Sequence, residues 1–195
     1  MATATATIDL NAIRQNWQKL RTISSNDAAA VVKANAYGLG VKQIAKALYE
    51  EGAKIFFVAT AEEGAELRSI LGKTPEIYVF SGHMIGDTEL IKNYNLIPLI
   101  NSIDQFSRHY KFLKEKKFGV QLDTGMNRLG MEPMEWESVK ERALSLNSVL
   151  IMSHLACADE PDHRMNSTQL KTFRTLTNEI NLKKSLAATG GILLG

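Results

Sequence analysis

Apolar segments of two kinds alternate along the chain. Stripes with helical spacing, such as Leu10, Ile13, Trp17 and Leu20, are separated by short continuous apolar runs. The runs are typical of buried parallel strands, which we expect at 29–32, 55–59, 76–80, 96–100, 118–122, 148–152 and 184–187. Helices are expected at about 10–20, 41–52, 61–71, 88–94, 102–116 (opened by a capping box of Ser102 and Gln105), 133–146 and 166–180.

Strict alternation of strands and helices predicts a parallel sheet, which is either doubly wound or closed into a barrel. The residues that follow the strands favour the barrel, because a polar group stands at the end of every strand. These residues are Lys33, Thr60, Ser81, Asn101, Asp123, Ser153 with His154, and Thr189. A (β/α)₈ barrel collects such groups around one mouth. The alternative is that these residues only begin loops.

The length limits how much of a barrel is present. A complete (β/α)₈ barrel usually takes about 250 residues and eight strands, whereas this sequence has 195 residues and seven predicted strands. We therefore expect residues 1–195 to form a single, incomplete barrel domain, an α/β fold interrupted after about seven strands.

The bulk composition excludes several classes of protein. The net charge of +2 gives no basis for binding nucleic acid or an anionic membrane surface. The apolar runs are too short to span a bilayer, and the first residues lack the pattern of a secretory signal. With one cysteine, Cys157, no internal disulfide can form, so a cytoplasmic location is the default. We interpret Cys157 as a small buried residue.

The most informative segment is 31–40, with the sequence VVKANAYGLG. Lys33 directly follows an apolar strand, where charge is unusual. A desolvated amine is suited to attack on a carbonyl group. Tyr37 lies near enough to offer a phenol to an anion, and Gly38 and Gly40 allow the backbone to approach a ligand. The alternative for Lys33 is a side chain that extends from the strand end into solvent.

Three further segments carry polar residues toward the same predicted mouth. Arg128, in the loop 123–130, is a permanent cation suited to a carboxylate or a phenolate oxygen. His154 follows a strand and is placed to stack on a planar ligand or to orient Arg128. Thr189 begins a glycine-rich turn of the kind that binds phosphate in barrels. A surface arginine, a structural histidine and an ordinary turn are the alternatives. The spacing of histidines and acidic residues supports no metal site.

Taken together, these segments resemble alanine racemases, the fold-type III enzymes that use pyridoxal 5'-phosphate (PLP). The matching stretches are 6–16 (ATIDLNAIRQN), 31–40 (VVKANAYGLG), 123–130 (DTGMNRLG), 153–160 (SHLACADE) and 185–195 (SLAATGGILLG). The likeness runs through the whole chain, and DTGMNRLG is its most specific element.

The resemblance implies roles for the residues named above. Lys33 would hold PLP as a Schiff base and act as one acid/base on the substrate. Tyr37 and Thr189 would contact the phosphate, Arg128 would bind the cofactor's phenolic oxygen and the substrate carboxylate, and His154 would lie against the pyridine ring. It also implies interconversion of L- and D-alanine, D-alanine supply for peptidoglycan, a cytoplasmic homodimer and no resident metal.

The sequence departs from the family pattern in three respects. Gln121 stands where many members have a lysine, often carbamylated, that orients the arginine. Ala188 and Thr189 replace an Asn-Ser pair. The arginine at the pyridine nitrogen, the eighth strand, the C-terminal β-domain and a tyrosine base from the partner subunit would all lie beyond Gly195. We therefore expect residues 1–195 alone to be inactive.

Two other functions remain open from the sequence. One is a PLP-binding carrier protein without catalysis, which the short length favours. The other is a PLP-dependent amino-acid decarboxylase of the same barrel type. The DTGMNRLG loop disfavours both of them.

Overall fold

The computed structural model describes residues 4–24 and 27–194. Within these residues the strands are β1 (Ala30–Val31), β2 (Ile55–Val58), β3 (Glu76–Val79), β4 (Ile97–Ile100), β5 (Phe118–Gln121), β6 (Ser148–Met152) and β7 (Lys183–Ser185). The helices are α1 (Leu10–Ile23), α2 (Lys33–Tyr37), α3 (Val41–Glu50), α4 (Ala61–Leu71), α5 (Thr88–Asn93), α6 (Ile103–Leu113), α7 (Pro133–Leu144), α8 (Arg164–Leu176) and α9 (Thr189–Leu193).

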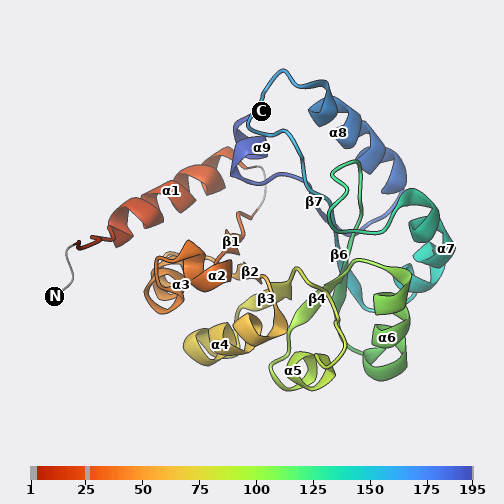
Figure 1. Ribbon diagram of the computed structural model, residues 1–195, viewed down its shortest axis with the longest axis horizontal. Helices are drawn as coiled ribbons and strands as arrows, with labels where there is room; N and C mark the ends of the chain where they lie inside the picture. Colours follow the sequence, from red (N-terminus) through yellow and green to blue (C-terminus); the bar gives the residue numbers. More distant parts are fainter. Residues whose placement is uncertain (1–3, 25–26, 195) are drawn as a thin grey trace.

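The seven strands form one sheet in the order β1-β2-β3-β4-β5-β6-β7, and every neighbouring pair is parallel. A doubly wound sheet would reverse its strand order at a switch point, so the sequential order confirms the predicted barrel type. Figure 1 shows the sheet curving, with α3 to α8 on its outer side and an opening between β1 and β7. The fold is therefore a part-closed (β/α) barrel.

Alternate residues along each strand pack on opposite sides of the sheet. Phe56 and Val58 of β2 belong to a cluster beneath α3 and α4, whereas Phe57 packs with Tyr78, Leu99 and other residues on the concave side. This alternation is the period-2 pattern of a strand with both faces buried. The concave side is thus a packed interior, as expected for a barrel of this kind.

Gly119 is required by the packing of this interior. A Cβ at position 119 would lie 2.6 Å from Leu99 Cδ2, which is closer than carbon atoms approach. Leu99 is fully buried and occupies the space that a side chain on β5 would otherwise take. The packing of the inner layer therefore requires glycine on β5, because the large side chain of Leu99 on β4 fills the space beside it.

Most predicted elements are confirmed, with ends that differ by a few residues. The α3 stripe of Val41, Ile44, Ala45 and Leu48 is buried as expected, and α7 begins at Pro133. The capping box predicted at the start of α6 is confirmed for Ser102 but not for Gln105. Ser102 accepts from the backbone of Gln105, but the Gln105 side chain bonds the Asn101 amide and the Ser81 carbonyl instead.

Three expectations were wrong or lie outside the described residues. The first strand is only two residues long, since the chain leaves the sheet before Lys33 to enter α2, which was not predicted. Cys157 is half-buried rather than buried. A break in the chain is also predicted at residues 24–27, between the first helix and the first strand, and it falls partly at residues 25 and 26, outside the described part.

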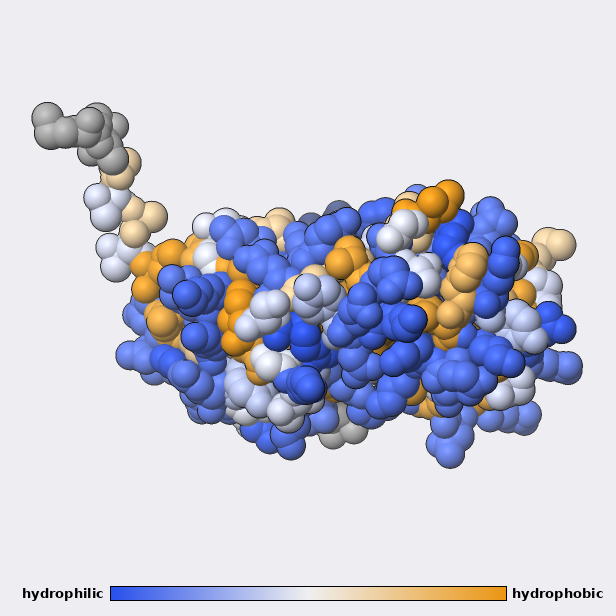
Figure 2. All heavy atoms as spheres, turned by 90° about the horizontal axis from the view of Figure 1, so that it is seen from below, coloured by the Kyte–Doolittle hydropathy of each residue, from blue (hydrophilic) through white to orange (hydrophobic). Residues whose placement is uncertain are grey.

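The outer surface is mainly hydrophilic in the view of Figure 2, with smaller hydrophobic areas between. At the opening of the barrel, Val31 of β1 is 40% exposed. Among the helices of the described residues, none is long and apolar enough to cross a membrane.

Candidate active site

The chain reverses its handedness directly after Lys33. Residues Ala34 to Tyr37 have φ values between 50° and 55°, so α2 contains a left-handed turn built from L-amino acids. Such a conformation costs about 1–2 kcal/mol per residue. Consecutive residues of this kind persist only where surrounding contacts hold them, and they cluster at functional sites.

Hydrogen bonds hold this turn from both ends. The Ala36 amide donates to the Val32 carbonyl, and the Gly38 amide donates to the Ala34 carbonyl. The Asn35 side chain accepts from the Val41 amide at 2.7 Å and so caps α3. The turn is therefore a closed unit between β1 and α3, with Lys33 at its entrance.

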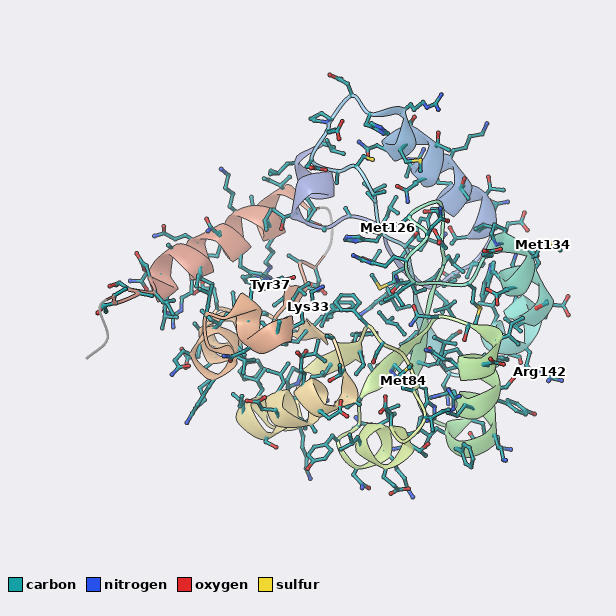
Figure 3. The ribbon with its side chains drawn as sticks, viewed as in Figure 1. Lys33, Tyr37, Met84, Met126, Met134 and Arg142 are labelled. Carbon is teal, nitrogen blue, oxygen red and sulfur yellow. The ribbon has the colours of Figure 1, made fainter. Side chains whose placement is uncertain are left out.

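The Lys33 amine lies over aromatic rings. Its Nζ is 5.5 Å from the centroid of Phe80 and 5.9 Å from that of Tyr37. Within residues 4–24 and 27–194, no carboxylate lies within ion-pair distance of this amine. Figure 3 shows Lys33 and Tyr37 together on the segment after β1. The amine thus lies at the concave side, and no carboxylate of the described residues neutralises it.

The loop after β5 carries Arg128 and is closed at its base. Met131 donates to the Gln121 carbonyl, and the Asp123 amide donates to the Met131 carbonyl. At the close of the loop Gly130 has a φ of 118°, and a Cβ there would lie 2.6 Å from the backbone of residues 122 and 123. The loop is therefore fixed at its base, while Arg128 is exposed.

Gln121, at the end of β5, is buried but only partly hydrogen-bonded. Its Nε2 donates to the Leu129 carbonyl at 3.3 Å, while its Oε1 has no partner within the described residues. A buried acceptor without a donor is costly, so such an atom marks a place where another group is expected. Gln121 thus offers an acceptor at the base of the Arg128 loop.

The charges of the Lys33 segment and of the Arg128 loop both affect His154. Burial, and then the positive charges of Arg128 and Lys33, lower the pKa of His154 below its usual value. The charges of both Arg128 and Lys33 therefore act on His154 and favour the neutral form of its imidazole.

A buried glutamine from α8, which the sequence did not single out, supports His154. Gln169 is fully buried. Its Nε2 donates to the His154 carbonyl and to Thr124 Oγ1, and its Oε1 accepts from the Ala156 amide. Thr124 is also hydrogen-bonded to Ser153. These bonds join the loops after β5 and β6 to one helix.

Thr189 begins α9, a five-residue helix where the sequence suggested only a turn. Its side chain is exposed, and Ala188 precedes it as the N-cap residue. Helix α9 contacts α1 beside the opening of the barrel (Figure 1).

Several other polar residues at strand ends have structural roles, as the simpler interpretation suggested. Thr60 caps α4, and the Asn101 side chain donates to the carbonyls of Phe80 and Leu99. Asp123 accepts from the amides of Gly125 and Met126 in a tight turn. No group of His, Cys, Asp or Glu in the described part of the chain could hold a metal ion.

Comparison with known proteins identifies the family. A family model described as "Alanine racemase, N-terminal domain" matches residues 8–195. The chain belongs to the alanine racemase family. An alanine racemase of Cereibacter sphaeroides (strain ATCC 17025 / ATH 2.4.3) is 57% identical over the whole chain, and the resemblance seen in the sequence motifs is thereby confirmed.

Solved structures of alanine racemases share the fold. The Bartonella henselae enzyme, described with covalently bound pyridoxal phosphate, superposes with a TM-score of 0.92 at 36% identity, covering 100% of this chain and 59% of that one. The biosynthetic enzyme of Pseudomonas aeruginosa gives 0.89 at 31% identity, covering 96% of this chain and 54% of that one. The chain spans 56% of the Cereibacter relative.

Proposed function

We propose that residues 1–195 form the PLP-binding barrel portion of an alanine racemase, with Lys33 as the anchor of the cofactor. The proposal rests mainly on the Lys33 amine, which follows β1, precedes a left-handed turn, lies over the Phe80 ring and has no ion pair within the described residues. Family membership and the PLP-containing relative from Bartonella henselae support it.

The residues present fit PLP. Lys33 supplies the amine that an aldehyde requires, and Tyr37 with Thr189 supplies hydroxyl groups for its phosphate. Arg128 offers a cation for the phenolic oxygen and for the substrate carboxylate. His154 supplies a planar, neutral ring. The unpartnered Oε1 of Gln121 is an acceptor that can orient Arg128 in place of the family's lysine.

Each residue then has a defined task. When bound, PLP withdraws electron density from the substrate's alpha carbon and so weakens its C–H bond. Lys33 moves a proton at one face of that carbon. Arg128 holds the carboxylate so that the bond to be broken keeps its orientation. Racemisation also needs a base on the opposite face, which we assign to sequence that the longer relatives have outside the matched region.

Other properties of the family are part of the same proposal. We infer alanine as the substrate, a homodimer, a cytoplasmic location and a role in supplying D-alanine for peptidoglycan. The match to named alanine racemases over the whole chain favours a racemase over a PLP carrier protein.

One assay tests the proposal. D-Alanine formation from L-alanine is measured with added PLP, using both residues 1–195 and the longest reading frame that contains them. We expect activity in the longer product, none in residues 1–195 alone, and none in a Lys33→Ala variant of the longer product. A longer product that binds PLP but forms no D-alanine would support the carrier instead.

A further inference from the structure

One carboxylate ties the peptide after Lys33 to the neighbouring strand. Glu63, in the first turn of α4, accepts from the Ala34 amide at 2.8 Å through Oε1 and from the Ala59 amide at 2.7 Å through Oε2. Ala34 directly follows Lys33, and Ala59 directly follows β2. The side chain thus joins the carboxyl ends of β1 and β2.

The bond to Ala34 fixes the orientation of the Lys33 backbone. The Ala34 N–H belongs to the peptide plane that begins at the Lys33 carbonyl, so holding this N–H sets ψ of Lys33. The other bonds of the turn begin at later amides, such as those of Ala36 and Gly38. Glu63 therefore acts at the entrance of the left-handed turn, where the path of the chain changes.

Glu63 lies where a helix N-terminus and several backbone amides meet. It lies near the N-terminus of α4, where the helix dipole favours an anion. The Glu63 amide also donates to Thr60 Oγ1 at 3.4 Å. Neither oxygen is used in an ion pair with Lys33. Hydrogen bonds from amides to a carboxylate are about twice as strong as neutral ones.

We propose that Glu63 is a positioning residue for Lys33. Its carboxylate holds the Lys33–Ala34 peptide in the orientation that presents the lysine amine to the concave side of the barrel. The proposal rests on the proposed function, in which that amine binds PLP.

Two measurements on Glu63→Gln test this role, with Glu66→Gln as the matched control. Glu66 is an exposed glutamate on the same helix. The glutamine variant keeps the shape of the side chain but turns an N–H₂ group toward one of the two amides. In protein without PLP, we expect hydrogen exchange at Ala34 or Ala59 to accelerate about 10-fold in Glu63→Gln and to stay unchanged in Glu66→Gln.

The second measurement is the dissociation constant for PLP, from the visible absorbance of the longest reading-frame product. We expect about 10-fold weaker binding in Glu63→Gln, as for the loss of one hydrogen bond to a charged group, and a change within about 2-fold in Glu66→Gln. Thermal unfolding is followed in parallel, since the positioning role predicts weaker binding in a protein that remains folded.

The outcomes separate this inference from the proposed function. Unchanged exchange and unchanged PLP affinity in Glu63→Gln would overturn the positioning role while PLP binding itself stands. Absence of PLP binding in the unaltered protein would overturn the proposed function, and the exchange experiment would still decide whether Glu63 holds the Ala34 peptide. If Glu63→Gln does not fold, Glu63→Asp, whose shorter side chain cannot span both amides, is expected to show the same two changes.

Discussion

The two sides of the barrel mouth differ in how completely the chain itself organises them. On the Lys33 side, the peptide after the lysine is bonded to Glu63, and the turn that follows is closed by its own amides and by Asn35. On the other side, Gln121 keeps a buried oxygen without a partner within the described residues, and Arg128 is exposed.

This difference matches the two kinds of contact that the proposed function requires. A covalent anchor must have one position, so the chain accepts an unfavourable turn to hold it. A cation that binds both a cofactor oxygen and a substrate carboxylate must form its contacts when the ligands arrive. Under the proposed function, the Lys33 side would be organised before PLP binds, whereas the Arg128 side would be completed when the ligands bind.

The largest expected effect contrasts two buried glutamines. Gln169→Leu removes the bonds to the Thr124 hydroxyl, the His154 carbonyl and the Ala156 amide, and we expect it to lower the free energy of unfolding by about 3 kcal/mol. Gln121→Leu removes one long bond and a costly unpartnered oxygen, so we expect a loss of about 1 kcal/mol or less. Urea denaturation measures the free energy of unfolding of both variants. Equal losses would contradict the different structural roles assigned to the two glutamines.

A smaller effect, with opposite signs, tests the left-handed turn. Ala34 has a φ of 50°, which glycine adopts without penalty, so we expect Ala34→Gly to raise the free energy of unfolding by up to about 1 kcal/mol. The matched change Ala65→Gly lies within the right-handed helix α4 and should lower it by about 0.5–1 kcal/mol. Thermal or urea unfolding gives the sign of the change in the free energy of unfolding for each variant. Destabilisation by both changes would contradict the left-handed conformation at Ala34.

The smallest effect concerns His154, whose pKa responds to cations of both sides. The charges of Lys33 and Arg128 both lower its pKa, after burial, so removing either cation should raise that pKa. Arg128→Gln and Lys33→Gln are compared by NMR titration of the ring in protein without PLP. Arg142→Gln is the control, since Arg142 lies on α7 on the outer side of the barrel (Figure 3) and stacks on Tyr110. If the pKa of His154 were unchanged in both Arg128→Gln and Lys33→Gln, neither cation would act on His154.

The sequence predicted the sheet because its signal is local and repeated. Buried strands such as Ile55–Val58 are continuous apolar runs, and helices such as Val41–Glu50 carry a clear stripe. Lys33, Arg128 and His154 could be picked out because each follows a strand, and the ends of parallel strands meet at one mouth.

The parts that were missed depend on contacts between distant residues. The left-handed turn could not be predicted, because no glycine between Lys33 and Tyr37 indicates positive φ values. The spacing of Thr60 and Glu63 fits a capping box, yet the Glu63 side chain bonds Ala34, which is 29 residues away in the sequence. The role of Gln169 likewise could not be predicted from the sequence, because its hydrogen-bond partners lie on two separate loops.

Chemical trapping can show whether PLP is bound covalently to Lys33. The longest reading-frame product is incubated with PLP, reduced with borohydride, digested and analysed by mass spectrometry, alongside Lys33→Ala. We expect a stable pyridoxyl group on the peptide that contains Lys33, and none on the corresponding peptide of the variant. A label on another lysine that persists in Lys33→Ala would contradict the assignment of Lys33 as the cofactor anchor.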